Sequence, residues 1–384
     1  MKGLRIAVVA GEASGDQLGV ALMEALRARR PDIEFRGVAG PKMRTAGCQL
    51  LAAAEELAVM GLFEVLGHLP RLWLLRRRLV RELAAWQPDV FVGIDAPAFN
   101  LGLAAQLKQR GLRTVQYVSP QVWAWRPGRV RHMADSVDRV LCLLPFEPPF
   151  YAEHALPAEF VGHPLADQIP LQPQRDAARA ALGLAADARV LAVLPGSRRG
   201  EVQRLGPDFI SAARSLAARH PGLQMLAPMA SPGVRVEFER QDAAAVGLRL
   251  LDGQARTLLQ AADVALVASG TATLEALLCG CPLVAAYRFG TLTSVLLQQL
   301  RSADLKHFSL PNLLAGETLV PEFFQNQATG EALAGAISAL LDDAPRRGQL
   351  QQRFLEIHRQ LRCDGAVRAA DAILRLMNSP VRRP

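Results

Sequence analysis

The chain has 384 residues, of which half are hydrophobic and 21% are charged, enough for two globular domains with sizeable cores. Its longest apolar stretch, residues 264–287, is interrupted by Glu275 and Pro282 and is not a membrane span. The net charge of +8 is compatible with an anionic membrane or with nucleic acid as a partner. Because aromatic residues make up only 5%, a surface that stacks single-stranded nucleic acid is not expected.

The cysteines and histidines form no recognised ligand pattern. The five cysteines are scattered without a C-x-x-C pair, and no histidines are spaced as H-x-x-x-H, so neither a zinc site nor a disulfide framework is indicated. The N-terminal segment holds too few consecutive apolar residues for a signal peptide. We expect a reduced, cytoplasmic protein that uses no metal and no cofactor.

Short apolar runs alternate with helical patterns in the first part of the chain. The run at residues 4–10 is followed by a Gly/Ser turn and an amphipathic stretch, the pattern of a buried strand that leads into a helix. Further strands of this part are predicted at residues 34–39, 90–95, 113–118 and 137–143. This alternation is typical of a parallel sheet covered by helices on both faces.

The same alternation restarts after a turn-rich segment at residues 160–173. Strands of the second part are predicted at residues 190–194, 223–227, 248–251, 264–268 and 283–286. The chain is then helical to about residue 377, in three pieces separated near Pro345 and Cys363. We therefore predict an α/β protein with two doubly wound domains that face a cleft. The predicted parts are residues 1–168, residues 169–362, and a final helix, residues 363–384, that packs back on the first domain.

Ligands of doubly wound sheets bind at the carboxyl ends of the strands, so the residues that follow each strand are candidates for a site. After the first strand, Gly11 and Gly15 allow a tight turn close to a ligand. Ser14 or Asp16 can cap the helix that follows. Asp95 closes the apolar strand VFVGID and serves either as a helix cap or as a general base. Neither G-x-G-x-x-G nor a P-loop is present, which argues against NAD-dependent oxidoreductases and P-loop NTPases.

Two turns of the second domain have the composition of a phosphate site. Arg198 follows a buried strand in the turn PGSR, where it either binds a diphosphate or is simply exposed. Ser269, Gly270 and Thr271 follow another buried strand and begin a helix, whose first N–H groups and dipole favour a phosphate. Glu275, about one turn later, either hydrogen-bonds a nucleotide sugar or complements the helix dipole.

The segment from residue 56 to residue 86 combines apolar residues at near-helical spacing with five arginines. Such a helix either packs in the core or lies on a membrane, with its apolar face at the headgroup boundary and its arginines on anionic lipid. The residues that would contact a membrane are Leu62, Val65, Leu66, Leu69, Leu72, Arg71, Arg76, Arg77 and Arg78.

An ordered set of motifs resembles the lipid-A-disaccharide synthase family. The set includes GEASGD, FVGIDAPAFN, YVSPQVWAWR, FVGHPLAD, LPGSRRGEV, ASGTATLEALL and SLPNLLAG, and it runs from residue 6 to about residue 363. The resemblance implies a GT-B type fold with two Rossmann-like domains. It also implies the transfer of a sugar from UDP-2,3-diacylglucosamine to 2,3-diacylglucosamine 1-phosphate (lipid X), which gives the β-1,6-linked lipid A disaccharide 1-phosphate and UDP.

The resemblance assigns roles to matching positions. Asp95 corresponds to the general base, and His163 lies in a motif that we expect near the cleft. The UDP pocket would consist of Arg198, Ser269, Gly270, Thr271 and Glu275. Gly11, Ser14, Gly15 and Asn312 would line the cleft. Ala98 stands where relatives commonly have Asp, so the acceptor side differs in detail.

Other classes of protein compete with this interpretation. A UDP-N-acetylglucosamine 2-epimerase or a peptidoglycan precursor transferase has the same fold, although the apolar and arginine-rich segment argues against the epimerase, which handles no lipid. A basic, non-catalytic protein that binds membranes or nucleic acid would not need Asp95. With the synthase as the expected function, the partners are the two acylated sugars and anionic inner-membrane lipids, without nucleic acid, at the cytoplasmic face of that membrane. The oligomeric state stays open, a homodimer included.

Overall fold

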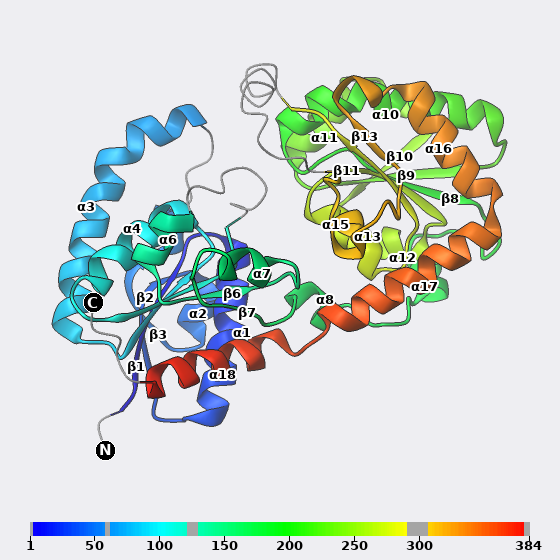
Figure 1. Cartoon of the computed structure of the whole chain (residues 1–384). Helices are drawn as coiled ribbons and strands as arrows, with labels where there is room; N and C mark the ends of the chain where they lie inside the picture. The colour runs from blue at the N-terminus through cyan, green and yellow to red at the C-terminus, as the bar shows by residue number, and fades with distance from the viewer. Residues whose placement is uncertain (1–2, 58–61, 121–129, 290–305, 380–384) are drawn as a thin grey trace. The chain divides into compact units, whose positions relative to one another are not determined.

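The computed structural model describes residues 3–57, 62–120, 130–289 and 306–379, with the side chains of residues 62–69 left out (Figure 1). The chain forms two compact units. The first unit consists of Met1–Asp167 and Leu361–Pro384, and the second of Gln168–Gln360. The chain therefore leaves the first unit once and returns to it, and its last helix belongs to the first unit.

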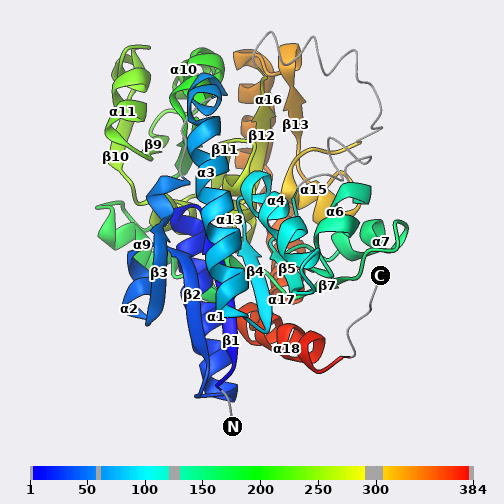
Figure 2. The same ribbon diagram turned by 90° about the vertical axis from the view of Figure 1, so that its left-hand side faces the viewer.

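The first unit is built on a seven-stranded sheet with the order β3-β2-β1-β4-β5-β6-β7, in which the paired strands are parallel. Figure 2 shows β3, β2, β1, β4 and β5 following one another from left to right. The strands are β1 (Arg5–Ala10), β2 (Glu34–Ala39), β3 (Cys48–Ala53), β4 (Val90–Ile94), β5 (Arg113–Tyr117), β6 (Arg139–Cys142) and β7 (Ala158–Phe160).

Helices cover both faces of this sheet, which explains the unbroken apolar run of β1. Ile6, Val8 and Ala10 point to one core cluster, whereas Ala7 and Val9 point to the other, because side chains alternate along a strand. The first cluster packs under α1 (Ala13–Arg29), α2 (Pro41–Thr45) and α18 (Gly365–Asn378). The second packs under α3 (Leu62–Trp86), α4 (Pro97–Lys108), α6 (Val130–Ser136) and α7 (Glu147–Ala152).

The second unit contains a six-stranded sheet with the order β10-β9-β8-β11-β12-β13, also with parallel pairs. Its strands are β8 (Val190–Leu194), β9 (Gln224–Met229), β10 (Leu248–Asp252), β11 (Val264–Ala268), β12 (Leu283–Tyr287) and β13 (Glu322–Phe324). β8 and β11 are buried along their whole length, so they form the centre of this unit.

The helices of the second unit form two groups. α10 (Arg199–Arg219) packs against α11 (Pro232–Glu239) and α16 (Gly330–Asp342). α12 (Ala255–Ala261) contacts α9 (Arg175–Ala181) and α13 (Thr271–Leu278), and α13 contacts α15 (Leu310–Ala315). Figure 1 shows the sheet between these groups. The remaining elements are α8 (Pro164–Gln168), α17 (Ala344–Leu361), η1 (Ala54–Glu56), η3 (Ala243–Val246) and η4 (Gln325–Gln327).

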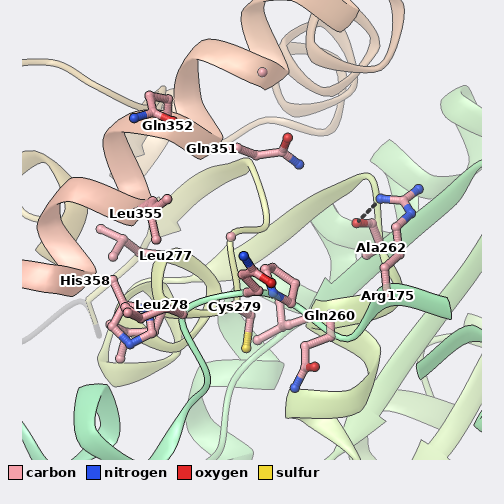
Figure 3. Close-up of a pocket in the computed structure, with 16 residues that line it drawn as sticks. Arg175, Gln260, Ala262, Leu277, Leu278, Cys279, Gln351, Gln352, Leu355 and His358 are labelled. Atoms are coloured by element: carbon pink, nitrogen blue, oxygen red, sulfur yellow. Dashed lines mark hydrogen bonds between the residues drawn. The ribbon is translucent and has the colours of Figure 1, made fainter. Parts of the chain in front are cut away.

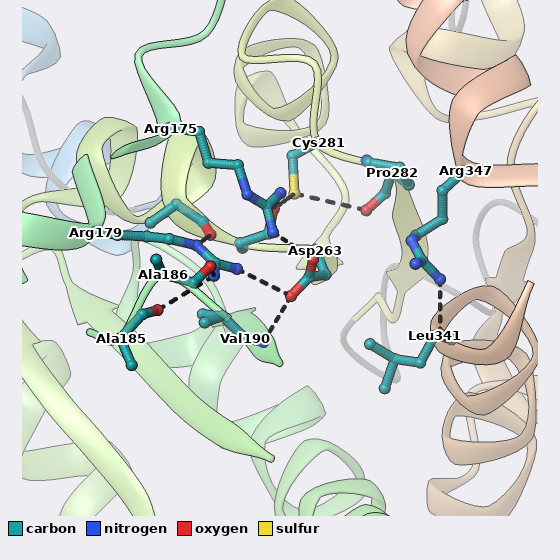
Figure 4. A network of polar contacts seen from close by, with 12 residues as sticks. Arg175, Arg179, Ala185, Ala186, Val190, Asp263, Cys281, Pro282, Leu341 and Arg347 are labelled. Carbon is teal, nitrogen blue, oxygen red and sulfur yellow. Dashed lines mark hydrogen bonds and ion pairs between the residues drawn. The ribbon is translucent and has the colours of Figure 1, made fainter. Parts of the chain in front are cut away.

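A buried ion-pair network ties the start of β8 to the start of β11 (Figure 4). The Asp263 carboxylate accepts hydrogen bonds from Arg175, from Arg179 at 3.2 Å and from the Val190 amide at 2.8 Å. The Arg179 side chain is only 3% exposed, so its charge is balanced inside the protein. The network fixes the two strands whose opposite ends carry the candidate phosphate turns.

The α/β class and the predicted strands are confirmed, each to within a residue or two. Three edge-side strands were not predicted: β3, β7 and β13. β7 and β13 have three residues each, too few to show a period. β3 has the sequence CQLLAA, which is rich in helix formers, and it becomes a strand because it pairs with β2. Within the described part of the chain, no helix is both long and apolar enough to cross a membrane.

Candidate active site

Each sheet reverses its strand order beside its first strand. In the first unit the reversal lies between β1 and β4, and in the second it lies between β8 and β11. Loops that leave neighbouring strands in opposite directions open a crevice there, which is where doubly wound proteins bind ligands. The predicted site residues that follow these four strands are therefore brought together in two groups, one in each unit.

In the first unit, the turn after β1 touches the loop after β4. Ala10 and Ile94 are paired in register at the ends of these strands. A Cβ atom at Gly11 would lie 2.8 Å from the Ala96 Cβ, so only glycine allows this approach. Ser14 is exposed on the first turn of α1, and Gly15 is buried behind it. The turn thus forms one wall of the crevice.

Asp95, in the loop that follows β4, has a strained backbone. Asp95 and Ala96 have φ values of 53° and 41°, the left-handed region, which costs about 1–3 kcal/mol for a residue other than glycine. The Asp95 N–H donates to the Tyr117 carbonyl at 2.9 Å. The Asp95 carbonyl accepts from Asn100 at 2.8 Å and from Gln116 at 2.9 Å. Three hydrogen bonds therefore hold this peptide in place.

The Asp95 carboxylate, by contrast, has no hydrogen-bond or ion-pair partner among the residues that the structure describes. The N-cap of α4 is Ala96, and no side chain caps this helix. Asp95 is also only partly buried. The helix-cap alternative is thus not realised here, and the carboxylate is free to accept a proton from a bound hydroxyl group.

Asp16 does cap a helix, although not the one expected. No side chain caps α1, whose N-cap is Glu12. The buried Asp16 carboxylate instead accepts from the amides of Lys42 at 2.9 Å and Met43 at 3.0 Å, at the start of α2. The expectation for Asp16 is corrected, because the fold brings a second helix terminus within reach of the same side chain.

In the second unit, the two phosphate turns leave adjacent strands at the same edge of the sheet. Leu194 and Val267 are paired in register near the ends of β8 and β11. The turn that carries Arg198 follows β8, and the turn that carries Ser269 follows β11. The sheet thus brings the two predicted halves of the UDP pocket to one crevice.

The N-terminus of α13 is open to a ligand. Gly270 and Thr271 are exposed, and a Cβ atom at Gly270 would meet no other atom within 4 Å. No side chain caps the helix, because its N-cap residue is Gly270, and the Thr273 hydroxyl donates to the Gly270 carbonyl at 2.8 Å. The first amides of α13 are therefore available to an anion, whose charge the helix dipole favours.

The other turn holds an internal carboxylate. Glu201 accepts from the Ser197 amide at 2.9 Å and lies 3.2 Å from the Arg198 guanidinium. The Arg198 side chain is 82% exposed, so this surface ion pair contributes little to stability. The exposed Arg198 side chain can therefore change rotamer to reach a phosphate, while Glu201 holds the backbone of the turn through the Ser197 amide.

Glu275 is paired within the unit. Its carboxylate lies 3.3 Å from the Arg256 guanidinium, and its side chain is 23% exposed. Burial raises the pKa of Tyr287, which ends β12 and lies near Glu201 and Arg198 rather than Glu275. One oxygen of the Glu275 carboxylate is thus paired with Arg256, and the side chain remains partly exposed.

Comparison with known proteins identifies the family to which these two crevices belong. The family model described as lipid-A-disaccharide synthetase matches residues 6–373, which include both. The chain belongs to the lipid-A-disaccharide synthase family. The lipid-A-disaccharide synthase of Pseudomonas aeruginosa is 53% identical over 378 residues, which cover 98% of each chain.

The fold of this family member is also that of the GT-B glycosyltransferases. The solved glycotransferase of kitacinnamycin covers 98% of the chain with a TM-score of 0.65 at 18% identity, and 99% of that structure is matched. A putative UDP-N-acetylglucosamine 2-epimerase from Listeria monocytogenes covers 99% of both chains with a TM-score of 0.67 at 13% identity. At these identities the likeness concerns the fold alone, whereas the family match separates the chain from epimerases.

Asn312 does not line the crevice as expected. It is fully buried in α15, and its amide donates to the Val320 carbonyl at 2.9 Å. Its oxygen accepts from the amides of Leu319 and Val320, both at 2.8 Å. Every polar group of this side chain is used to hold the connection to β13, which corrects the assignment.

The helix α3 presents a different face from the predicted one. Leu72 packs against the core, and Arg76 lies 5.3 Å from the Phe99 ring. Arg78 donates to the Leu51 carbonyl at 2.7 Å. Leu72 and Arg76 therefore point inward, which corrects their assignment to a membrane surface, whereas the Arg78 side chain is 43% exposed and its assignment stays a prediction. The side chains of Leu62, Val65, Leu66 and Leu69 lie outside the described residues.

The exposed residues of α3 follow a helical spacing of their own. Trp73 and Leu74 are 52% and 60% exposed, and Pro70, Arg77 and Arg81 are exposed as well. Arg77 stacks over the Trp73 ring at 4.5 Å, and Arg71 lies 3.8 Å from Glu56. We call the exposed residues Pro70, Trp73, Leu74, Arg77 and Arg81 the α3 face. They combine apolar and cationic groups on one side of the helix.

His163 is structural. It is 9% exposed, and its Nδ1 accepts from the Leu165 amide at 3.2 Å, while the backbone N–H of His163 donates to the Leu361 carbonyl at 3.0 Å. Burial lowers the pKa of His163 to about 4. His163 is therefore neutral near pH 7, and its Nδ1 is used inside the protein. Asp95 remains the candidate base, because its carboxylate has no partner among the described residues.

A pocket of about 450 Å³ lies elsewhere in the second unit (Figure 3). It is lined by Leu277 and Cys279 from the end of α13, by Gln260, and by Gln351 and Leu355 of α17. It sits at the opposite end of α13 from Ser269, and it contains none of the predicted site residues. The pocket is therefore separate from the candidate active site.

Sequence reasoning missed the residues that support the site. Asn100 and Gln116 were not assigned a role, although each is a polar residue in an apolar setting. Buried amides are nearly always hydrogen-bonded, so a Gln inside the strand RTVQY was a usable signal. Its partner, the Asp95 carbonyl, lies 21 residues away and follows only from the pairing of β4 with β5.

Proposed function

We propose that the protein is an inverting glycosyltransferase that joins UDP-2,3-diacylglucosamine to 2,3-diacylglucosamine 1-phosphate. The products are the β-1,6-linked lipid A disaccharide 1-phosphate and UDP. The observation that supports this most strongly is the family match, which spans both units and includes the turns that carry Asp95 and Ser269. In this proposal the first unit binds the acceptor and the second binds the nucleotide.

Asp95 would act as the general base on the acceptor. Its carboxylate takes the proton of the 6-hydroxyl while the oxygen attacks the anomeric carbon of the donor. The bond between that carbon and the diphosphate breaks at the same time, so an α-linked donor gives a β product. A single displacement needs one base and no covalent intermediate, and the Asp95 carboxylate can supply that base.

The second unit would stabilise the leaving group. UDP departs with its negative charge, which the open amides of α13 and the guanidinium of Arg198 can receive. Ser269 and Thr271 would add hydroxyl donors, and Glu275 would accept from the hydroxyls of the ribose. Stabilisation comes from groups held in place before the reaction, so little reorganisation is needed.

The α3 face supports a peripheral position on the cytoplasmic side of an inner membrane. Trp73 and Leu74 can enter the headgroup boundary, and Arg77 and Arg81 can contact anionic lipid. Both substrates carry acyl chains, so an enzyme at the membrane surface meets them where they reside. The membrane-contact proposal now rests on these residues together with Arg71.

Product analysis tests the proposal directly. The purified protein is incubated with both acylated sugars. Mass spectrometry should find a disaccharide whose mass equals that of the two substrates together less that of UDP, with one mole of UDP released per mole of disaccharide. A donor without acyl chains, UDP-N-acetylglucosamine, serves as the control. Its conversion to an epimer without any acceptor, together with the absence of disaccharide, would instead identify an epimerase.

A further inference from the structure

Two buried side chains hold the backbone of Asp95. Its carbonyl oxygen receives two side-chain amides from different elements, Asn100 of α4 at 2.8 Å and Gln116 of β5 at 2.9 Å. Both side chains are buried, with exposures of 0% and 1%. Buried side-chain amides nearly always form hydrogen bonds, and here two of them donate to the same backbone carbonyl.

The two amides also connect this peptide to neighbouring strand ends. The Asn100 amide lies 3.3 Å from the Val9 carbonyl, at the end of β1. The Gln116 amide lies 3.3 Å from the carbonyl of Val118. Val118 has a φ of 76°, which is exceptional for a β-branched residue. The amides therefore bridge three strand ends around the switch point.

Asp95 thus has a fixed backbone and an unengaged carboxylate. Asp95 and Ala96 both have a left-handed backbone conformation, which persists only where contacts with neighbouring groups stabilise it. The Tyr117 carbonyl, Asn100 and Gln116 are the described groups that do so. A fold that only needed to end β4 could use an unstrained turn without these two buried amides.

We propose that Asn100 and Gln116 are positioning residues, which hold the Asp95 backbone so that its carboxylate meets the acceptor hydroxyl. This inference rests on the proposed function, in which Asp95 is the base. Neither side chain needs to touch substrate. A misplacement of about 1 Å at a reacting group can cost 10²-fold in rate, so loosening this peptide should lower turnover without weakening nucleotide binding.

The variant Gln116→Met tests this, because Met keeps the length of the side chain and removes the amide. Thr114→Val is the matched control. Thr114 is buried on the same strand, and its hydroxyl donates to the Ser136 carbonyl at 3.1 Å. Both variants lose a buried hydrogen bond from β5, but only Gln116 contacts Asp95. Turnover, UDP affinity and melting temperature are measured for each.

We expect Gln116→Met to lower kcat at least ~10-fold with UDP affinity within ~2-fold, whereas Thr114→Val keeps kcat within ~2-fold at a similar loss of melting temperature. The decisive step is a double-mutant cycle. In an Asp95→Asn background, Gln116→Met should lower kcat by less than ~2-fold, because a residue that acts through Asp95 has nothing left to position.

The outcomes separate this inference from the proposed function. Equal losses from Gln116→Met in both backgrounds, or full turnover in Gln116→Met alone, would overturn the positioning role while Asp95 remained the base. Near-normal turnover in Asp95→Asn would instead remove the proposed base, and with it the basis of the inference. If Gln116→Met does not fold, Asn100→Ser removes the other amide and enters the same cycle.

Discussion

Individual residues of this protein differ mainly in whether their polar groups are already used. Asp16, Asn312 and Asp263 are all satisfied by internal donors, so they maintain the fold. Asp95 and Arg198 keep a charged group accessible to ligands. This difference, more than residue type, separates structural residues from candidates for chemistry.

The variant Asp95→Asn should reduce turnover by at least ~10², because an amide keeps the size of the side chain but cannot accept the proton of the hydroxyl. UDP affinity, measured by calorimetry, should stay the same, since the donor binds to the other unit in the proposed mechanism. The variant and the parent protein are compared in steady-state turnover at saturating substrates.

His163→Ala is the control for this prediction. It should lower stability but leave turnover of the folded fraction near normal, because His163 is buried and internally bonded. Loss of turnover in His163→Ala together with retention in Asp95→Asn would reverse the roles. Inhibition by EDTA would contradict the metal-free mechanism.

Arg198→Ala should weaken UDP binding by about 1.5–3 kcal/mol, the usual contribution of a hydrogen bond to a charged group. Calorimetric titration with UDP measures the effect. Arg249→Ala is a matched control, because Arg249 also belongs to the second unit but donates to the Leu182 carbonyl. Unchanged UDP affinity in both Arg198→Ala and Glu275→Ala would remove the assignment of this pocket.

At the scale of elements, α3 has one buried side and one exposed side. Leu75 and Leu79 are buried against the sheet, whereas Trp73 and Leu74, which directly precede Leu75 in the sequence, are exposed. The core side explains why a long amphipathic helix is needed between β3 and β4. The α3 face is not used in this core and can contact another surface.

The double variant Trp73→Ser/Leu74→Ser should reduce binding to anionic vesicles while the melting temperature stays near that of the parent protein, because both side chains are exposed. Co-sedimentation with vesicles is the measurement. Binding of the parent should also weaken with added salt, since each arginine near the surface contributes roughly 1 kcal/mol that salt screens.

Leu79→Ser is the contrasting variant, because Leu79 is fully buried and its replacement should destabilise the first unit. Unchanged vesicle binding in Trp73→Ser/Leu74→Ser would show that this side of α3 does not contact lipid. A strong loss of melting temperature in the same variant would mean that the face is covered in the native protein.

At the scale of the whole molecule, the chain closes on its first unit. The Asp167 carboxylate accepts from the amides of Cys363, Asp364 and Gly365, at 3.1, 3.0 and 2.7 Å, and so caps α18. Ala369 and Ile373 of α18 are buried in the same cluster as β1. The last helix thus completes a core begun by the first strand.

Asp167→Ala should lower the free energy of unfolding by about 1–2 kcal/mol, the usual cost of losing a helix cap. Chemical denaturation of the full chain measures this loss. Asp187→Ala, in an exposed turn of the second unit, is the control and should change stability little. Equal stabilities of the two variants would show that the cap is dispensable.

His163 makes the stability of the first unit depend on pH. The folded state keeps the imidazole neutral down to a pKa of about 4, while the unfolded chain takes up a proton near the ordinary value of 6.5. Stability from this group is therefore complete above pH 6.5 and is lost as the pH falls towards 4, by up to about 1.4 kcal/mol per pH unit.

His163→Asn should flatten this dependence, because the amide oxygen can still accept from the Leu165 amide but does not titrate in that range. Denaturation curves of both proteins between pH 7 and pH 4.5 provide the comparison. Parallel pH profiles of the variant and the parent would show that another group is responsible.

Local patterns in the sequence were sufficient for the architecture. Apolar runs such as VLAVL and VALVA predicted the central strands β8 and β11, because a strand buried on both faces has no polar positions. The ordered motifs were sufficient for the family, because a set of this length in the same order along nearly the whole chain is specific even where a single motif is not. These signals are short-range, and they are visible without knowing which segments meet.

Only the tertiary structure decided how the polar side chains are used. The partners of Asp16, Asn100 and Asn312 come from other elements, and strand pairing brings Gln116 to Asp95. The side of α3 that is exposed depends likewise on which face the sheet covers. Hydrogen bonds and burial are set by contacts between distant segments, so a sequence pattern can nominate Asp95 while the fold determines that its carboxylate is free.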